Sequence, residues 1–453
     1  MTTIPGLPTD GASVKGLDRA HVFHSWSAQR NLDPLPVASA LGSHFTDFDG
    51  NRYLDFSSQL VNINIGYQHP KLVAAIQEQA GKLCSIQPGF SNDARSEAAR
   101  LLAELAPGDL NHVFFTNGGA EANENAMRMA RAATGRLKVL SAYRSYHGAT
   151  AGAIALTGEP RRWANEPGMP GIVHFTGPYP YRSAFYAESP EQETERALVH
   201  LRNTVVLEGA STVAAVILET VVGTNGILVP PPGYLAGVRA LCDEFGIMMI
   251  ADEVMAGFAR CGEWFAVDHW GVTPDLITFA KGVNSGYVPL GGVIMSQKIY
   301  DAFLDDVFYG GLTYSGHPLA CAAAVASINI FKEEGIVEHS RALGEDTIGP
   351  GLDKLAANHP SIGEVRGLGT FWAIELVRDR ATREPMVPFN AKGADAAPMA
   401  AIGKACKDRG LWPMIAGNRI HVVPPCTTSV DEVEQGLSIL DEALTVADSY
   451  TTG

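Results

Sequence analysis

Through the middle of the chain, short apolar runs alternate with longer amphipathic stretches. Residues 120–135 have the spacing of an amphipathic helix, which ends at Gly135. The apolar runs have the length of buried strands and fall within residues 111–119, 137–148, 213–223, 246–254, 275–282 and 290–296. Strands that alternate with helices predict a mostly parallel sheet covered on both faces, which is an α/β fold.

The two ends of the chain have a different pattern. Residues 44–56, HFTDFDGNRYLDF, place Asp49-Gly50 between two strand-like runs, which predicts a hairpin. The C-terminal part mixes helical stretches with short strands such as FWAIELV and NRIHVVPP. We interpret residues 1–65 and 335–453 as two parts of one smaller α+β domain, and residues 66–334 as the large α/β domain.

The composition of the chain limits which binding partners and which cellular compartment we expect. Of 453 residues, 34 are Lys or Arg and 49 are Asp or Glu, a net charge of -15, which argues against binding to nucleic acid or to an anionic membrane. The six cysteines form no CxxC pair, and the N-terminus lacks the basic start and apolar core of a signal peptide. No apolar run approaches the roughly 20 residues that span a bilayer. We therefore expect a cytoplasmic protein without nucleic-acid or membrane partners.

Three ionisable residues stand at the ends of apolar runs in the central region: Glu219, Asp252 and Lys281. In an open parallel sheet, ligands bind outside the carboxyl ends of the strands. One helix-plus-strand unit separates Asp252 from Lys281, so we expect them on different strands that face one crevice. One explanation is a buried structural ion pair, although its desolvation cost makes it a poor source of stability.

A pyridoxal phosphate site is the second explanation. A lysine amine can condense with the aldehyde of this cofactor, and a carboxylate facing the pyridine nitrogen keeps that nitrogen protonated. The phosphate needs amide donors at a helix N-terminus, which Gly118, Gly119 and Ala120 offer before the predicted helix. A glycine pair in this position is, by itself, more often only a tight turn.

Two further residues fit such a site but have simpler explanations. Tyr146, in SYHG, is a candidate for stacking on the cofactor ring or for ordinary packing. Thr313, in the glycine-rich stretch GGLTYSGHP, is a candidate phosphate ligand or a helix cap.

Taken together, these stretches resemble the class III pyridoxal-phosphate-dependent aminotransferases, the family of ω-amino acid and amine transaminases. The resemblance runs from DFDGNRYLDF near the start to VVPPCTTS near the end. The stretches FTNGGAEANENAMRMAR, YHG, IADEVMAGFARCG, FAKG and TYSGHP follow the order and spacing of the family. The resemblance implies fold type I, with a mostly parallel seven-stranded sheet in the large domain and a smaller α+β domain. It also implies a homodimer, alone or as a dimer of dimers, with active sites at the subunit interface.

The resemblance also implies a role for each candidate. Lys281 would form the Schiff base and move the proton, and Asp252 would pair with the pyridine nitrogen. The other residues of the implied cofactor site are Gly119 and Ala120 at the phosphate, Tyr146 and Val254 on the two ring faces, His147, Glu219, and Thr313 at the phosphate of the neighbouring subunit. Where the family often has Ser-Gly-Ser, this chain has Gly118-Gly119-Ala120, so the phosphate must be held by backbone amides and other donors.

The substrate-binding candidates also come from the resemblance. Residues 56–66 align with a pocket segment that carries a tryptophan in many amine transaminases. Here that position corresponds to Val61, which indicates more room, and its neighbour Leu60 is a further candidate. Trp26, in RAHVFHSWSAQ, lies in a segment similar to the substrate entrance of taurine transaminases, or packs in the core. A keto acid brings a carboxylate that suits a guanidinium. Arg419 is the candidate, although the usual arginine position could instead correspond to His421.

The expected function is a ping-pong transfer, through pyridoxamine phosphate, of the amino group of an ω-amino acid or amine such as taurine or β-alanine. The acceptor would be a keto acid such as pyruvate or 2-oxoglutarate. The same fold and residues would also serve a racemase, a decarboxylase or an amino-alcohol phosphate lyase. A nucleotide-dependent dehydrogenase is disfavoured because no GxGxxG opens the first strand–helix unit. A non-catalytic binding protein would lack a visible cofactor band that is lost on borohydride treatment.

Overall fold

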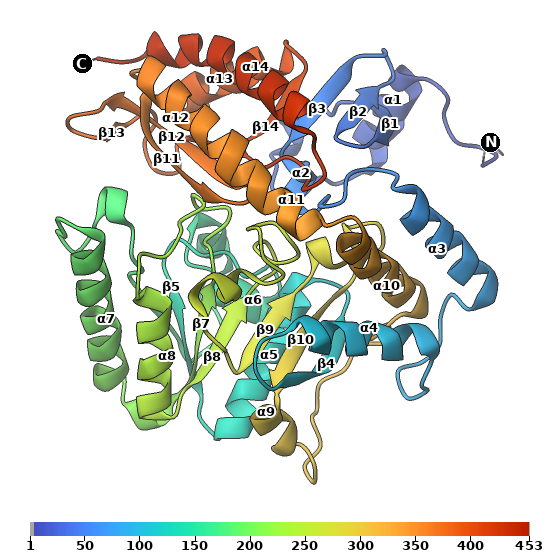
Figure 1. Ribbon diagram of the computed structural model, residues 1–453, viewed down its shortest axis with the longest axis vertical. Helices are drawn as coiled ribbons and strands as arrows, with labels where there is room; N and C mark the ends of the chain where they lie inside the picture. Colours follow the sequence, from blue (N-terminus) through green and yellow to red (C-terminus); the bar gives the residue numbers. More distant parts are fainter. Residues whose placement is uncertain (1–3, 453) are drawn as a thin grey trace.

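The computed structural model describes residues 4–452 and contains two large sheets. A seven-stranded sheet with helices on both faces forms the lower body in Figure 1, and an eight-stranded sheet with its own helices lies above it. The expected α/β fold with a second, smaller α+β unit is confirmed.

The seven-stranded sheet carries the apolar runs that the sequence indicated as strands. Its order is β4 (Leu110–Thr116), β10 (Gly291–Ser296), β9 (Leu276–Phe279), β8 (Met248–Asp252), β7 (Val213–Glu219), β5 (Lys138–Ala142) and β6 (Ile172–Phe175). Strand β10 runs antiparallel to both of its neighbours, whereas the pairs from β9 to β6 are parallel. The segment 280–290 that connects β9 to β10 is too short for a parallel crossover, so the chain turns back directly.

Helices cover this sheet on both faces because its strands are apolar on both sides. On one face, α5 (Gly119–Thr134) and α6 (Ala151–Leu156) share a core with Met248 and Ile250. On the other face, Met249 and Ala251 belong to cores formed with the helices α4 (Asp93–Leu105), α7 (Pro190–Leu207), α8 (Tyr234–Phe245) and α10 (Pro318–Glu333). Helix α3 (Pro70–Lys82) packs beside α10, and α9 (Gln297–Asp301) follows β10.

The second sheet combines strands from both ends of the chain. Its order is β1 (Val37–Leu41), β2 (His44–Asp47), β3 (Arg52–Phe56), β14 (Leu411–Ala416), β15 (Arg419–Val422), β12 (Phe371–Asp379) and β11 (Ile362–Leu368), with β13 (Glu384–Pro385) beside β12. Strands β2 and β3 form the expected hairpin, in which Gly50 has a φ of 87°. Strand β3 joins the C-terminal strands by pairing in parallel with β14.

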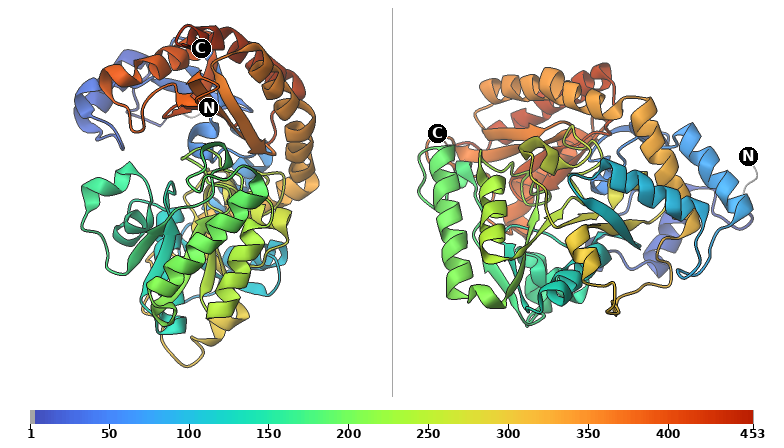
Figure 2. Two further views of the ribbon diagram at one scale, coloured as in Figure 1. Left: turned by 90° about the vertical axis from the view of Figure 1, so that its left-hand side faces the viewer. Right: turned by 60° about the horizontal axis from the view of Figure 1, so that its bottom comes forward.

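The helices of this upper unit are α11 (Ile336–Leu343), α12 (Gly349–Asn358), α13 (Ala397–Lys407) and α14 (Val430–Asp448). They share a core with strands from both ends of the chain, including Leu54 and Phe56 of β3. The two short N-terminal helices are α1 (Gly11–His21) and α2 (Ser58–Val61). Figure 2 shows the blue N-terminal strands beside the red C-terminal elements, above the large sheet. The domain limits at residues 65 and 335 stay a prediction.

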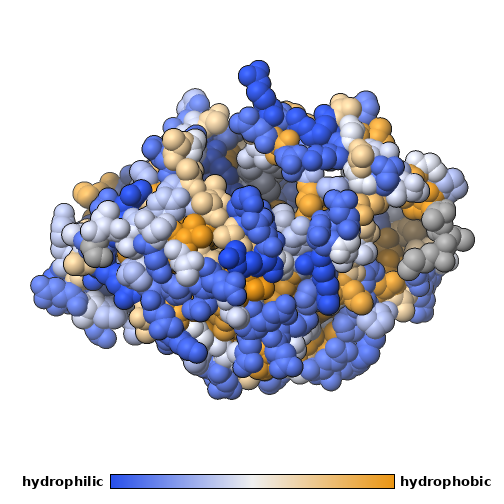
Figure 3. Space-filling model, turned by 90° about the horizontal axis from the view of Figure 1, so that it is seen from above, coloured by the Kyte–Doolittle hydropathy of each residue, from blue (hydrophilic) through white to orange (hydrophobic). Residues whose placement is uncertain are grey.

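Seen from above, the upper unit exposes a mainly hydrophilic surface with scattered hydrophobic residues (Figure 3). Within residues 4–452, no helix combines the length and the apolar character needed to cross a membrane.

Candidate active site

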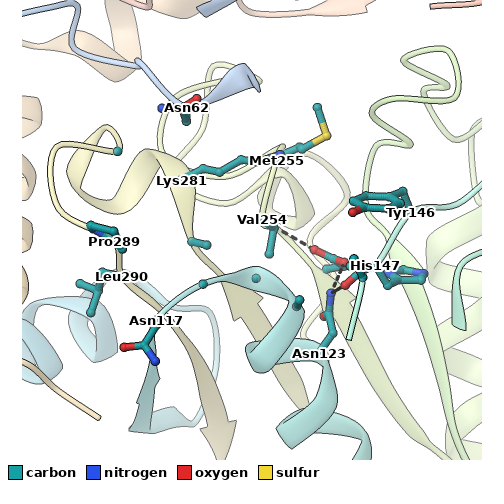
Figure 4. A pocket seen from close by; sticks show the side chains of 18 of the residues that line it. Asn62, Asn117, Asn123, Tyr146, His147, Val254, Met255, Lys281, Pro289 and Leu290 are labelled. Atoms are coloured by element: carbon teal, nitrogen blue, oxygen red, sulfur yellow. Dashed lines mark hydrogen bonds and ion pairs between the residues drawn. The ribbon is translucent and has the colours of Figure 1, made fainter. Parts of the chain in front are cut away.

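The carboxyl ends of β7, β8 and β9 meet at a pocket of about 390 Å³ beneath the upper unit. Glu219 ends β7 and stands opposite Asp252, which ends β8, and Lys281 follows β9. Gly118, at the start of α5, also lines the pocket. Glu219, Asp252 and Lys281 line the same pocket, and Figure 4 shows Lys281 between Asn62 and Val254. The predicted strand-tip crevice therefore exists.

Lys281 reaches this space from a tight turn directly after β9. Burial lowers the pKa of its amine to about 8, while the carboxylates of Asp252 and Glu219 oppose that shift. The simple ion pair between Asp252 and Lys281 is not formed: among the described residues, the ion-pair partner of Asp252 is His147. A buried amine with a depressed pKa and no direct carboxylate partner suits condensation with an aldehyde, which needs the neutral amine.

Asp252 is held by donors on both carboxylate oxygens. Its Oδ2 accepts hydrogen bonds from Asn123 Nδ2 at 2.7 Å and from His147 Nδ1 at 2.7 Å, and its Oδ1 accepts one from the Val254 amide at 3.1 Å. Thr278 in turn donates to Asn123 Oδ1 at 2.7 Å. These donors fix the orientation of the Asp252 carboxylate, the group that a pyridinium nitrogen would need opposite it.

Sequence reasoning missed Asn123. The signal available was a polar residue beside Ala122 and Ala126 on the buried side of an amphipathic helix, where an amide is kept only if it finds partners.

Glu219 is the second carboxyl group of the site. It accepts hydrogen bonds from the Tyr146 amide at 2.8 Å and from the Gly223 amide at 2.9 Å. Burial raises its pKa to about 7, an effect that His147 opposes and the nearby Asp252 charge reinforces. Glu219 thus anchors the loop that presents Tyr146 to the pocket.

The first turn of α5 supplies free amide donors. Gly118 is the N-cap residue, and no side chain caps the helix there. A Cβ on Gly119 would come within 2.8 Å of Val254 Cγ1, which explains the glycine. Gly118, Gly119 and Ala120 all line the pocket, so an anion would meet the helix N-terminus there.

These features fit pyridoxal phosphate. The amides at the uncapped start of α5 could bind the phosphate, and the Asp252 carboxylate could pair with the ring nitrogen. The buried amine of Lys281 could condense with the aldehyde. Tyr146 and Val254 stand on the pocket wall (Figure 4).

The structure does not place every predicted residue on the pocket wall. Val61 is 1% exposed and packs against Val221 and Met255, so its neighbour Asn62 lines the pocket instead. Val61 also has a φ of 60°, a left-handed conformation that is unusual for a β-branched residue. Leu60 is 53% exposed and does not line the pocket.

Three other predicted residues also lie off the wall. Thr313 is exposed in the single chain, and Trp26 is 63% exposed. Arg419 is half-buried near Arg366, Tyr179 and Glu375 and does not line the pocket. Roles for these residues stay predictions.

Arg161 is a candidate that the sequence did not reveal. Its guanidinium lies 3.6 Å from the centre of the Tyr146 ring and 6.0 Å from that of Trp26. Its Nε pairs with Glu159 at 2.6 Å, whereas its buried Nη2 has no partner within residues 4–452. The charge of Arg161 also helps to lower the pKa of Lys281. Nothing in GEPRRW distinguishes Arg161 from a surface arginine, since its position depends on the fold of the 143–166 loop region.

Comparisons with known proteins identify the family of this chain. The family model for class III aminotransferases matches residues 27–444. The taurine:2-oxoglutarate aminotransferase of Bifidobacterium kashiwanohense, solved in complex with PLP and glutamate, is 42% identical and superposes with a TM-score of 0.94 over 99% of both chains. The taurine–pyruvate aminotransferase of Bilophila wadsworthia is 32% identical, covering 97% of this chain and 98% of the relative. The putrescine–pyruvate aminotransferase of Pseudomonas aeruginosa is 34% identical over 90% of each.

The chain therefore belongs to the class III aminotransferases. It is a fold type I enzyme that transfers amino groups with pyridoxal phosphate as its cofactor.

Proposed function

We propose that this enzyme takes the amino group from an ω-amino acid with a distal anionic group, such as taurine or β-alanine. The acceptor is a keto acid such as pyruvate or 2-oxoglutarate. The observation that carries the donor class is Arg161, a cation whose buried Nη2 is unpartnered among the described residues and which stacks on the pocket residue Tyr146. The similarity to taurine aminotransferases supports the same donor class.

The remaining residues take roles that their positions support. Pyridoxal phosphate, when bound, supplies the aldehyde and the electron sink for the reaction. Lys281 binds the cofactor covalently and then moves a proton at its Nζ. Asp252 holds the proton on the ring nitrogen, with His147 and Asn123 orienting its carboxylate.

The other predicted cofactor contacts involve residues that line the pocket. Gly119, Ala120, Tyr146 and Val254 line the pocket, so the amides of Gly119 and Ala120 would bind the phosphate, and Tyr146 and Val254 would flank the ring. Glu219 holds the backbone that carries Tyr146.

Arg161 is better placed than Arg419 to bind the distal anion of the donor. Arg161 touches the pocket residue Tyr146, and its charge acts on Lys281. Arg419 instead belongs to a buried cluster in which Arg366 binds Glu375 and Tyr179. That cluster ties β11 and β12 to the loop around Tyr179. The carboxylate of the keto acid remains the proposed ligand of Arg419, after local rearrangement.

The proposal includes a cytoplasmic homodimer, in which Thr313 reaches the phosphate of the neighbouring subunit. The exposure of Thr313 in the single chain is consistent with this role. The net charge of -15 and the lack of CxxC pairs support the compartment.

Exchange of Arg161 tests the donor class. Arg161→Leu should lower kcat/KM for taurine and β-alanine about tenfold to hundredfold, because a lost hydrogen bond to a charged group costs about 1.5–3 kcal/mol. The value for the cationic donor putrescine should stay the same or rise. Arg161→Lys should retain part of the activity with the anionic donors.

Arg162→Leu is the matched control, because Arg162 pairs with Glu166 four residues on, whereas Arg161 stacks on the pocket residue Tyr146. Equal losses for anionic and cationic donors in Arg161→Leu would contradict the proposed donor class.

Borohydride reduction followed by mass spectrometry tests the covalent step, and a pyridoxyl group on a lysine other than Lys281 would refute the proposed role. Amination of the keto acid in step with consumption of the donor separates transamination from racemase, decarboxylase or lyase activity.

A further inference from the structure

Three turns with unfavourable backbone geometry meet around Lys281. Left-handed φ values occur within residues 58–61, at Phe258 and Ala259, and at Lys281 and Ser285, although none of these residues is a glycine. Lys281 itself has a φ of 45°. Residues with side chains adopt such conformations only where the surrounding structure imposes them, and such residues gather at functional sites. Something must therefore hold these turns in place.

Asn64 links the first two turns. The side chain is 1% exposed, and its Nδ2 donates to the carbonyl oxygen of Phe258 at 2.7 Å. Its Oδ1 accepts a hydrogen bond from Arg260 Nη2 at 3.1 Å, and the same Nη2 donates to Ser58 Oγ at 3.1 Å. One amide and one guanidinium thus bridge residues 58–64 to the turn at 258–260.

The same amide touches the turn that carries Lys281. A Cβ on Gly282 would come within 2.5 Å of Asn64 Nδ2 and 2.9 Å of Phe258 Cβ, so the backbone beside Lys281 lies directly against both groups. The next residue, Ile65, donates its amide to Ser285 Oγ at 3.1 Å. Asn64 is therefore the point at which all three turns meet.

Arg260 anchors this arrangement to the upper unit. Its side chain is fully buried, and its Nη1 donates to the carbonyl oxygen of Pro424 at 2.5 Å and to Thr370 Oγ1 at 3.1 Å. Within the described part of the chain, its acceptors are neutral and no carboxylate forms an ion pair with it. A buried charge without a carboxylate is a poor way to gain stability, so a positional role explains Arg260 better.

We infer that Asn64 is a positioning residue for the reaction, anchored by Arg260, which holds the turn of Lys281 so that the lysine amine faces the cofactor. The inference rests on the proposed role of Lys281 and extends it to a residue outside the pocket lining. Loss of the Asn64 amide should let the three turns relax independently, and the lysine amine should then lose its alignment.

The test uses Asn64→Ala, Asn64→Asp and a matched control. Gln79→Ala is that control, because Gln79 is also a buried amide that donates to a carbonyl oxygen, that of Leu83, at 2.7 Å, but it lies in α3 outside the pocket. Each apoprotein is mixed with pyridoxal phosphate, and three quantities are measured: the rate at which the visible band of the lysine-bound cofactor forms, the pH midpoint of that band, and Tm.

In Asn64→Ala, we expect cofactor attachment to slow by up to about a hundredfold, as for a reacting group displaced by about 1 Å. The pH midpoint should shift, while non-covalent binding of the cofactor persists. Gln79→Ala should lower Tm by a similar amount without changing either cofactor property. Asn64→Asp keeps the acceptor toward Arg260 but loses the donor to Phe258, so its attachment rate should lie between those of Asn64→Ala and the wild type.

Attachment rates and pH midpoints of both Asn64 variants equal to those of the wild type would overturn the inference. Should Asn64→Ala fail to fold, the isosteric Asn64→Asp decides alone by the same two readouts. A wild-type enzyme that forms no adduct at Lys281 would instead refute the proposed function, so the two failures are distinguishable.

Discussion

Burial moves the pKa values of individual residues at this site toward neutral pH. The pKa of Lys281 falls to about 8 and that of Glu219 rises to about 7, in both cases chiefly because the charged form is poorly solvated. Groups that change protonation near neutral pH are what proton transfer requires. His421, by contrast, is fully buried with a pKa lowered to about 3, first by burial and then by the charge of Arg419, so it stays neutral.

The depressed pKa of Lys281 predicts how the apoprotein takes up its cofactor. Only the neutral amine attacks the aldehyde, so the attachment rate should fall about tenfold per pH unit well below pH 8 and level off above it. Stopped-flow absorbance across a pH series measures this rate. A rate that keeps rising toward the ordinary lysine value of 10.5 would show that burial does not shift this amine.

Replacement of Asp252 by Asn tests the charge opposite the ring nitrogen. Asp252→Asn keeps the shape but removes the charge, so the rate of the donor half-reaction should fall about 10²–10³-fold, as for other lost electrostatic stabilisers. Single-turnover kinetics measure it. Asp47→Asn is the control, because Asp47 is a buried carboxylate in the β2–β3 hairpin that accepts hydrogen bonds from Asn51 and Tyr53 but lies far from the pocket lining. A near wild-type rate in Asp252→Asn would remove Asp252 from the mechanism.

At the scale of elements, the start of α5 is shaped by its contact with the loop after β5. Gly148 has a φ of 132°, and a Cβ on it would come within 2.5 Å of Ala120 Cβ. The loop can therefore approach the first turn of α5 only with glycine at this position. Because the loop and the helix lie this close together, Tyr146 and the amides of the first turn of α5 line the same pocket.

Gly148→Ala should displace the first turn of α5 and weaken cofactor binding about tenfold or more, since a strained backbone costs about 1–3 kcal/mol. Equilibrium dialysis of pyridoxal phosphate measures the Kd. Gly42→Ala is the control, because Gly42 also has a positive φ, 59°, but a Cβ there would meet nothing within 4 Å. Equal Kd values for the two variants would show that this close approach does not control phosphate binding.

At the scale of the whole molecule, the single chain exposes large side chains near predicted interface residues. Tyr309 is 86% exposed and Tyr314 is 58% exposed, on either side of Thr313. Exposed aromatic groups clustered in one loop are typical of a surface that another chain covers. The proposed homodimer would cover this loop.

Mixed dimers of Thr313→Ala and Lys281→Ala test whether Thr313 acts across that interface. In such a dimer, the intact Lys281 comes from the Thr313→Ala subunit, and under the proposal the threonine beside it comes from the Lys281→Ala subunit. That site should bind cofactor with normal affinity, whereas a Thr313→Ala homodimer should lose about tenfold to hundredfold, for about 1.5–3 kcal/mol. Weakened affinity in the mixed dimer would place Thr313 in the pocket of its own subunit.

The main features of the fold and the reacting groups could be predicted from sequence because both are encoded locally. Apolar runs of strand length end at Glu219, Asp252 and Lys281, and parallel strands must bring their carboxyl ends to one edge. The order of the motifs identified the family. The direction of β10 could not be read from its apolar pattern, because strand direction depends on the length of the preceding connection.

The sequence by itself determined the class of fold and the cofactor, through its periodicity and the order of its family motifs, and it predicted the residues that react. Only the tertiary structure decided which groups support them. Asn123, Arg161 and Asn64 contact partners distant in the chain, and no local pattern marks a side chain whose partner is set by packing. The same holds for Val61, which packs in the core while Asn62 takes its expected place on the pocket wall.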